Sequence, residues 1–180
     1  GITLLEEAMG EKISIGEIFI TEKCIDKIPN ITNYHTYLVS ESVFQKISTQ
    51  KNSQGVVFTV KIPKKHFAGK QFIALDNMQD SGNVGTIIRT ADAFGIDGVI
   101  LIGNCADPFS PKSIRASMGS IFRMPVFEMQ ASELAATPLP IYSAVLSPKV
   151  KSIKEVDFSN AIVVIGNEAR GVSDEIKALS

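Results

Sequence analysis

Continuous apolar runs alternate with helix-like segments in the last two thirds of the sequence, and this alternation limits the fold more than any other feature. The runs lie at Gln71–Leu75, Gly98–Ile102, Pro140–Leu146 and Ala161–Ile165. A strand that is apolar along its whole length, rather than at every second residue, is buried on both faces. Buried strands separated by helices are typical of a parallel sheet covered by helices on both sides. We therefore predict an α/β domain with at least four parallel strands.

A second, smaller α/β unit is predicted in the first third of the chain. Short β-rich segments there are separated by segments with helical spacing of apolar residues, and Ser40 is a good N-cap for the second helix. The predicted elements are helices over Ile2–Met9 and Glu41–Ile47 and strands over Glu17–Ile20, Thr36–Val39 and Gly55–Val60.

Between the two units the composition becomes basic and poor in apolar residues. Lys61, Lys64, Lys65 and Lys70 all fall in this short stretch. We therefore predict a small domain at 1–62, a linker at 63–70 and a larger domain at 71–180. A solvated connector explains these lysines as well as a binding surface does. The net charge of the whole chain is −1, so a surface for nucleic acid has to be a local patch.

Composition also excludes several classes of protein. No apolar run approaches the roughly 18 residues that a membrane-spanning helix needs. The 2 cysteines lie far apart, and the 2 histidines cannot build a zinc site by themselves. We expect no membrane partner, no metal, and reduced thiols in a cytoplasmic protein. The first residue is Gly1 and the last residues read as an unfinished helix, so we expect a portion of a longer protein.

Three polar segments with glycines follow or adjoin the predicted strands of the larger domain. They are a loop over Asp76–Gly85, the serine-rich stretch Asp107–Ser120, and the turn Gly166–Gly171. The first leads into a helix, Thr86–Phe94, with Ile87, Ile88, Ala91 and Phe94 predicted to point inward. Ligands of open parallel sheets bind beyond the carboxyl ends of the strands, and glycine allows a backbone to approach them closely. These segments are therefore the candidate site.

Taken together, these segments carry a resemblance. DSGNVGTIIRTADAFG at Asp80–Gly95, RASMG at Arg115–Gly119 and IGNEARGV at Ile165–Val172 resemble, in order and spacing, stretches of the SpoU (TrmH-type) RNA methyltransferases of the SPOUT superfamily. The resemblance implies a Rossmann-like parallel-sheet domain with a C-terminal trefoil knot. The family's third signature, Ser-Leu-Asn-x-Ser, is missing from these residues, so the knot segment is expected to be incomplete. The first third looks like the RNA-binding domain of relatives, similar to kink-turn-binding ribosomal proteins.

The resemblance also implies an activity, partners and site residues. The activity is transfer of a methyl group from S-adenosylmethionine to a ribose 2′-OH of ribosomal or transfer RNA, by a homodimer with its site at the interface. We interpret Arg89 as a clamp for phosphate and ribose rather than a base, because a guanidinium stays protonated in proteins. The implied residues are Asn83, Arg89 and Glu168 for catalysis, Leu146, Ile165, Gly166 and Gly171 for the cofactor, and Lys64, Lys65, Arg115 and Ser117 for RNA.

Two other hypotheses stay open. The chain could be a non-catalytic RNA-binding protein, although the intact set of Asn83, Arg89, Gly166 and Glu168 argues against it. It could also be a Rossmann-type nucleotide-binding enzyme. Against that, the sequence has no G-x-G-x-x-G, and Ile102-Gly103-Asn104 stands where an acidic residue would end the second strand.

Overall fold

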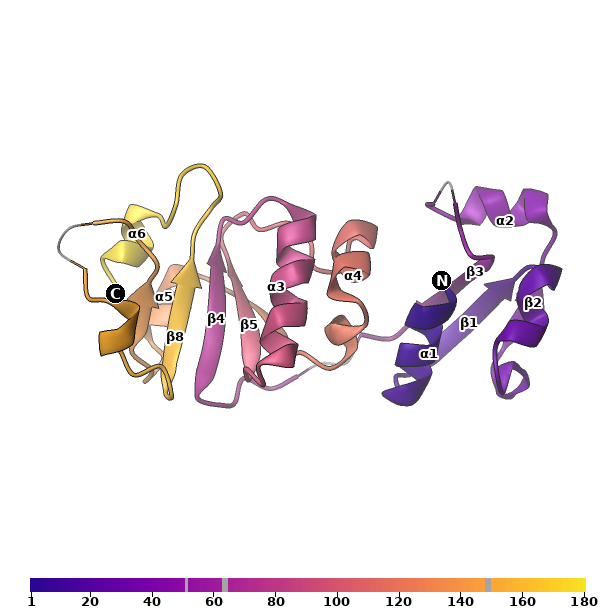
Figure 1. The fold of residues 1–180 in the computed structure, drawn as a ribbon, viewed down its shortest axis with the longest axis horizontal. Coiled ribbons are helices and arrows are strands. Elements are labelled where there is room, and N and C mark those ends of the chain that lie inside the picture. The colour runs from indigo at the N-terminus through magenta and orange to yellow at the C-terminus, as the bar shows by residue number, and fades with distance from the viewer. Residues whose placement is uncertain (51, 63–64, 148–149) are drawn as a thin grey trace. The chain divides into compact units, whose positions relative to one another are not determined.

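The computed structural model describes residues 1–50, 52–62, 65–147 and 150–180. The chain divides into two compact units, residues 1–64 and 65–180 (Figure 1). Pro63 and Lys64, at the start of the predicted linker, lie outside the described residues. Within the described part of the chain, no helix is both long and apolar enough to cross a membrane.

The smaller unit is built on a three-stranded mixed sheet in the order β2-β1-β3. Strand β1 is parallel to β2 and antiparallel to β3. Leu5 of the first helix packs with Ile18, Ile20 and Val56 of the sheet to form the core. The elements are α1 (Ile2–Gly10), β1 (Ile15–Ile20), two short 3-10 turns (Glu22–Lys27 and Ile31–Asn33), β2 (Thr36–Leu38), α2 (Glu41–Ile47) and β3 (Val56–Val60). The mixed α/β character predicted for this unit is confirmed.

The larger unit contains a five-stranded parallel sheet in the order β6-β5-β4-β8-β7. The predicted parallel sheet is confirmed, and β6 is a strand that the apolar pattern did not predict. The strands are β4 (Gln71–Asp76), β5 (Gly98–Ile102), β6 (Val126–Met129), β7 (Ile141–Ser143) and β8 (Ala161–Ile165). The helices are α3 (Ser81–Ala93), α4 (Pro111–Ser117), α5 (Ala131–Ala135) and α6 (Asp174–Lys177), with 3-10 turns at Ser120–Phe122 and Ile153–Glu155.

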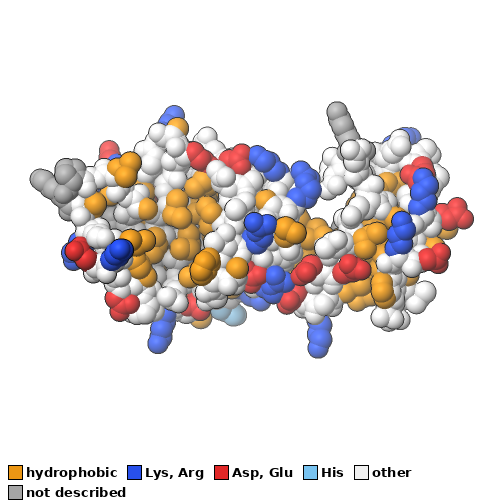
Figure 2. Space-filling model, viewed as in Figure 1, with side chains coloured by type: hydrophobic (Ala, Val, Ile, Leu, Met, Phe, Trp, Pro, Cys, Tyr) orange, Lys and Arg blue, Asp and Glu red, His pale blue; other side chains and the backbone are white. Residues whose placement is uncertain are grey.

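The two faces of this sheet are covered differently. Alternate residues of β4 and β8, such as Ala74 and Val164, belong to one buried cluster with Leu134 of α5 and Ile176 of α6. On the opposite face, α3 buries Val84, Ile88 and Ala91. Ile73 of β4 and Val163 of β8 are register partners, and both remain partly exposed. Figure 2 shows hydrophobic side chains at the surface in this region.

The start of α3 differs from the prediction. The helix begins at Ser81, so the segment through Gly85 is helical rather than a loop. Asp80 caps it, because its Oδ1 accepts a hydrogen bond from the Asn83 backbone N–H at 2.9 Å. Phe94, predicted to point inward, is 79% exposed, since α3 ends at Ala93 and Phe94 lies beyond its last turn.

Gly85 serves close packing between helices. A Cβ at this position would lie 2.2 Å from the Ser113 carbonyl oxygen in α4. The absence of a side chain therefore allows α3 and α4 to touch through their backbones (Figure 1).

The strand order reverses direction beside β4. Strands β4, β5 and β6 run in sequence toward one edge, whereas β7 and β8 lie on the other side of β4. The order thus changes direction between β4 and β8. Such a switch point opens a crevice at the carboxyl ends of the strands, where ligands of open α/β sheets bind.

Each unit has its own core, and this generates a test. We expect Leu5→Ala to lower the free energy of unfolding of residues 1–64 by about 2–5 kcal/mol, because Leu5 is fully buried. Leu134→Ala, equally buried, is the matched variant for the larger unit. In hydrogen–deuterium exchange, Leu5→Ala should expose the amides of β1 and β3, and Leu134→Ala those of β4 and β8. Equal loss of protection in both units from either variant would contradict separate cores.

Candidate functional site

The carboxyl end of β4 is tied to the chain that follows β8. Asp76 is only 1% exposed. Its Oδ2 accepts a hydrogen bond from the Ser173 backbone N–H at 2.6 Å, and its Oδ1 accepts one from the Asn77 side-chain amide, also at 2.6 Å. Hydrogen bonds to a charged acceptor are stronger than neutral ones, and a buried carboxylate is costly without them. Asp76 therefore fixes the segment before α6 against the central strand.

Asn77 joins the loops after three strands. Its φ of +54° is in the left-handed region, which asparagine tolerates better than most residues. Its Oδ1 accepts the Asn104 backbone N–H at 2.9 Å, which connects it to the loop after β5. Its carbonyl oxygen accepts the Asn167 side-chain amide, also at 2.9 Å, which connects it to the loop after β8. These bonds hold together the loops at the carboxyl ends of β4, β5 and β8.

The loop after β8 is a closed turn. The backbones of Asn167 and Gly171 exchange hydrogen bonds of 3.0 and 2.8 Å. Inside the turn, the Asn167 Oδ1 accepts the backbone N–H groups of Ala169 and Arg170. Gly171 has a φ of +71°, which favours glycine. The turn holds its shape by its own hydrogen bonds and presents Glu168 to solvent.

Gly166 is required by this turn itself. A Cβ on Gly166 would lie 2.1 Å from the backbone carbon of Gly171 and from the backbone nitrogen of Val172. We expected this glycine to leave room for a ligand. The structure gives a different reason: the backbone at Gly166 lies in direct contact with the backbone of Gly171 and Val172, which leaves no room for a side chain.

Asn83 and Glu168, both predicted site residues, are hydrogen-bonded to each other. The Glu168 Oε1 accepts the Asn83 side-chain amide at 2.9 Å and the Asp80 backbone N–H at 3.4 Å. The hydrogen bond from Asn83 is the largest of the contacts that lower the pKa of Glu168, so this carboxyl group is ionised at neutral pH. The contact joins α3 to the loop after β8.

Asp80 is held by a lysine that sequence reasoning did not single out. The Lys112 Nζ of α4 donates to the Asp80 Oδ2 at 2.6 Å. This bond, together with the one from the Asn83 backbone, lowers the pKa of Asp80. Lys112 thereby connects the start of α4 to the cap of α3.

Arg89 lies on the exposed side of α3 and does not pair with Glu168. Its Nη1 is 3.1 Å from the Sδ of Met118, which follows α4 and is 60% exposed. The Glu168 carboxylate bonds instead to Asn83 and Asp80, and the described residues contain no direct Arg89–Glu168 pair. A thioether is a weak acceptor, so the guanidinium keeps most of its capacity to bind oxygen atoms.

The residues proposed for RNA lie in different environments. Arg115 and Lys65 are exposed, and Lys64 lies outside the described residues. Ser117 is fully buried, and its hydroxyl donates to the Ile114 carbonyl oxygen at 2.8 Å. The expected contact of Ser117 with RNA is therefore corrected: this serine stabilises the last turn of α4 from inside.

The loops proposed for the cofactor lie at the ends of β7 and β8. Leu146 is fully exposed three residues beyond β7, and Ile165 ends β8. Within the described chain, the buried Ser143 hydroxyl at the end of β7 has no hydrogen-bond partner. Leaving a buried hydroxyl unpaired is costly. An exposed apolar side chain and an unpaired buried hydroxyl on the segment that ends β7 fit a ligand with both apolar and polar atoms, such as S-adenosylmethionine.

Sequence reasoning missed the residues that build this site from beneath, namely Asp76, Asn77, Lys112, Asn167 and Ser173. A signal existed for two of them, because Asp76 and Asn77 follow a buried strand directly and begin a polar segment. Lys112 had no comparable signal, since its partner is 32 residues away in the sequence.

Comparison with protein families accounts for both units. Residues 70–180 match the model described as the SpoU rRNA Methylase family. Residues 1–66 match a model described as RNA 2′-O ribose methyltransferase substrate binding.

Individual relatives and solved structures resemble the whole chain. A 23S rRNA guanosine 2′-O-methyltransferase of Bacillus subtilis is 30% identical, over 96% of this chain and 71% of the relative. A solved TrmH-family RNA methyltransferase, described as putative, from Porphyromonas gingivalis is 31% identical with a TM-score of 0.82, over 99% of this chain and 75% of that one. An AdoMet-bound rRNA methyltransferase of Sinorhizobium meliloti is 29% identical with a TM-score of 0.82, over 99% and 73%.

The Asn83–Glu168 contact can be tested by titration. We expect the Glu168 carboxyl group to titrate below its usual pKa of 4.5 and Asn83→Ala to move that pKa upward, because the amide stabilises the ionised form. The lowered pKa makes the contact stabilising above pH 4.5, and this contribution is lost as pH falls through the folded-state pKa. Carboxyl carbon NMR would follow the titration. Asn160→Ala, in an exposed turn before β8, is the control. An unchanged Glu168 midpoint in Asn83→Ala would contradict the contact.

Proposed function

The chain belongs to the SpoU rRNA methylase family, and from this premise we propose that it transfers a methyl group from S-adenosylmethionine to a ribose 2′-OH of ribosomal RNA. The observation that carries the proposal is the hydrogen bond between Asn83 and Glu168. Asn83 lies on α3, the helix that carries Arg89, and Glu168 lies in the loop after β8. This hydrogen bond brings residues of two separate signatures together at the switch point, where a ligand of this fold binds. The matched relatives that act on ribosomal RNA support the choice of RNA class.

When bound, the cofactor supplies a methyl group that is already activated as part of a sulfonium. The task left to the protein is to hold the ribose hydroxyl in line with that methyl group and to exclude water. Arg89 donates to a phosphate or ribose oxygen and remains protonated, so its positive charge stabilises the ribose oxygen while the hydroxyl proton passes to bulk solvent. The weak contact with Met118 keeps the guanidinium near α4 until an RNA oxygen replaces the sulfur.

Glu168 and Asn83 position the groups around the reacting atoms. The Glu168 carboxylate is ionised and accepts two hydrogen bonds, so it holds the start of α3 at a fixed distance from the loop after β8. Asn83 is the donor of one of these bonds, on the first turn of the helix that carries Arg89. Both residues thereby set where Arg89 stands relative to the cofactor loops.

The cofactor is proposed to bind at the ends of β7 and β8. Leu146 would cover an apolar part of it, and the Ser143 hydroxyl would gain the hydrogen bond that it lacks. Backbone groups of Ile165, Gly166 and Gly171 would supply the remaining contacts. The unpaired Ser143 hydroxyl and the exposed Leu146 three residues later support this placement.

Finer features implied by the resemblance are part of the proposal. They are a C-terminal trefoil knot, a homodimer, a linker at 63–70 between domains at 1–62 and 71–180, and a cytoplasmic location. RNA would contact Lys64, Lys65 and Arg115. The half-exposed Ile73 and Val163 suggest that a further segment or a second copy covers this face of the sheet, because parallel sheets are buried on both faces.

Titration calorimetry with S-adenosylmethionine and with NAD tests the cofactor class directly, and preference for NAD would favour a nucleotide-binding enzyme.

Replacement of Arg89 tests the catalytic role. We expect Arg89→Ala to lower methyl transfer to ribosomal RNA by about 100- to 1,000-fold, the loss typical of removing one donor from a developing anion. Its melting temperature should not change, because the side chain is exposed. Arg89→Lys should restore only part of the activity, since an ammonium lacks the planar fork. Lys154→Ala, which removes an exposed cation elsewhere in the same unit, is the control. A large fall in melting temperature would show that Arg89 is structural.

Replacements of Leu146 and Gly166 distinguish a contact with the cofactor from a role in the structure of the loop. We expect Leu146→Ala to weaken S-adenosylmethionine binding by about 10- to 100-fold, as for loss of a covered leucine side chain, without changing the melting temperature. Gly166→Ala should lower both the affinity for S-adenosylmethionine and the melting temperature, because its Cβ would clash with the backbone of the turn. Ile153→Ala, also highly exposed, is the control in calorimetry and thermal unfolding. Unchanged affinity in Leu146→Ala would place the cofactor elsewhere.

A further inference from the structure

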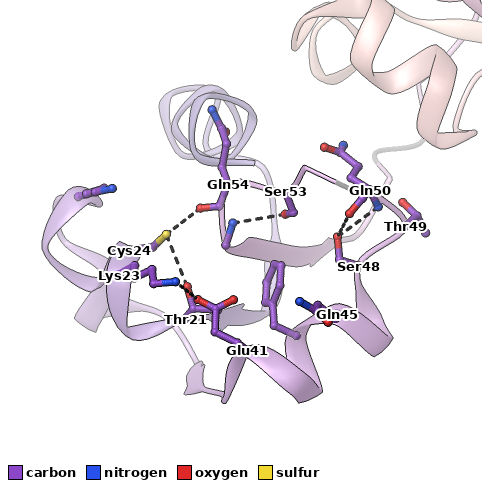
Figure 3. A pocket seen from close by; sticks show the side chains of 13 residues that line it. Thr21, Lys23, Cys24, Glu41, Gln45, Ser48, Thr49, Gln50, Ser53 and Gln54 are labelled. Carbon is purple, nitrogen blue, oxygen red and sulfur yellow. Dashed lines mark hydrogen bonds and ion pairs between the residues drawn. The ribbon is translucent and has the colours of Figure 1, made fainter.

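A polar pocket of about 760 Å³ opens in the smaller unit, and the proposed methyl transfer does not use it. Three segments form its walls, namely the 3-10 turn after β1, the helix α2, and the stretch just before β3 (Figure 3). Its volume is within the range of sites that hold small organic ligands. All the lining residues belong to residues 1–64, so the pocket is complete within one compact unit.

The floor of the pocket is held in place without a ligand. Thr21, Cys24 and Phe44 are each at most 3% exposed. The Cys24 thiol donates to the Gln54 carbonyl oxygen at 2.7 Å (Figure 3). The Thr21 backbone N–H donates to the Gly55 carbonyl oxygen at 3.0 Å. These bonds connect the turn after β1 to the stretch before β3, so two of the three walls keep a fixed spacing.

Gly55 is part of this floor for a specific reason. Its φ is +85°, and a Cβ there would lie 2.6 Å from the Thr21 hydroxyl and 2.7 Å from the Cys24 sulfur. A side chain would therefore be strained and would push the two walls apart. The pocket is pre-organised, which lowers the entropy lost when a ligand binds.

The rim carries ammonium and amide groups. Lys23 forms an ion pair of 2.8 Å with Glu41 across the space between the turn and α2 (Figure 3). Lys27 adds a second ammonium group to the lining, so the charged residues of the pocket sum to a positive charge. Gln45 and Gln50 add side-chain amides, and both are exposed.

This chemistry matches a nucleotide. Ammonium groups bind phosphate oxygens, and an amide, which donates and accepts side by side, pairs with the edge of a base. Sites for other small organic ligands are lined mostly by apolar side chains, whereas this lining is dominated by hydroxyl, amide and charged groups. Phe44, the aromatic side chain of the floor, is only 3% exposed, so recognition here depends on base edges rather than on stacking.

We propose that this pocket binds one unpaired nucleotide of the substrate RNA and thereby selects the RNA region presented to the larger unit. The proposal rests on the proposed function, because it takes RNA to be the substrate. The nucleotide must be unpaired, since the major groove of paired RNA is too deep and narrow for side chains to read base edges. An amide on the rim, Gln45, reads the base, and Lys27 binds a neighbouring phosphate.

The test uses the full chain with protein-free bacterial large-subunit ribosomal RNA. Gln45→Ala and Lys27→Glu should each raise the KM for this RNA by about tenfold while kcat and the affinity for S-adenosylmethionine stay unchanged. Lys12→Glu, an exposed charge reversal outside the pocket of the same unit, should leave the KM as it is. A fully paired RNA duplex should bind wild type and both pocket variants equally.

A second measurement locates the RNA independently of turnover. Ribosomal RNA containing 4-thiouridine is irradiated with the protein, and the crosslinked peptides are identified by mass spectrometry. We expect crosslinks in peptides from α2 and from the turn after β1, and we expect Gln45→Ala to reduce them. Crosslinks confined to residues 65–180, or an unchanged KM in both variants, would overturn the pocket assignment while leaving the methyl transfer intact. A wild-type protein that binds neither S-adenosylmethionine nor transfers methyl groups would instead overturn the proposed function, and the crosslinks would still decide the pocket.

Discussion

The buried carboxylate of Asp76 is the contact on which the candidate site depends. It ends the central strand and accepts hydrogen bonds from Ser173 and Asn77, so it joins the chain after β8 to the end of β4. A carboxyl group this deeply buried is stable only when its oxygen atoms are hydrogen-bonded, and removal of one partner leaves the cost of its desolvation. The loops after β4, β5 and β8 are therefore constrained together through Asp76 and Asn77.

The residues that hold the loops in place differ from the residues proposed to contact the substrate. The buried or half-buried Asp76, Asn77 and Asn167 shape the loops, whereas the exposed Arg89 and Glu168 face the solvent from which substrate arrives. Glu168 belongs partly to both groups, because its carboxylate holds α3 against the loop after β8. This division explains how the loops keep their shape while the charged groups stay accessible to an RNA chain.

Glycines in the two signature segments have a packing role that a ligand-centred view would overlook. Gly85 allows α3 and α4 to touch, and Gly166 allows two backbone segments of one turn to pass each other. Gly55 has a comparable role in the smaller unit, where it keeps two walls of the polar pocket together. In all three places the absence of a side chain allows other atoms of the protein to pack against the glycine, and this packing sets the shape of the nearby surface.

The sequence by itself determined the parallel sheet of the larger unit, the mixed α/β character of the smaller one, and the family, because apolar periodicity and short signature segments are local properties of the chain. It also grouped the segments that carry Asn83 and Glu168 into one candidate site, through the rule that ligands bind beyond the carboxyl ends of the strands. Only the tertiary structure decided that Glu168 bonds to Asn83 rather than to Arg89, that Ser117 and Phe94 point opposite to expectation, and that Lys112 holds Asp80. These outcomes depend on contacts between residues far apart in the chain, as between Asn83 and Glu168, which are 85 residues apart. Local pattern carries no information on which of several nearby polar groups a side chain finally reaches.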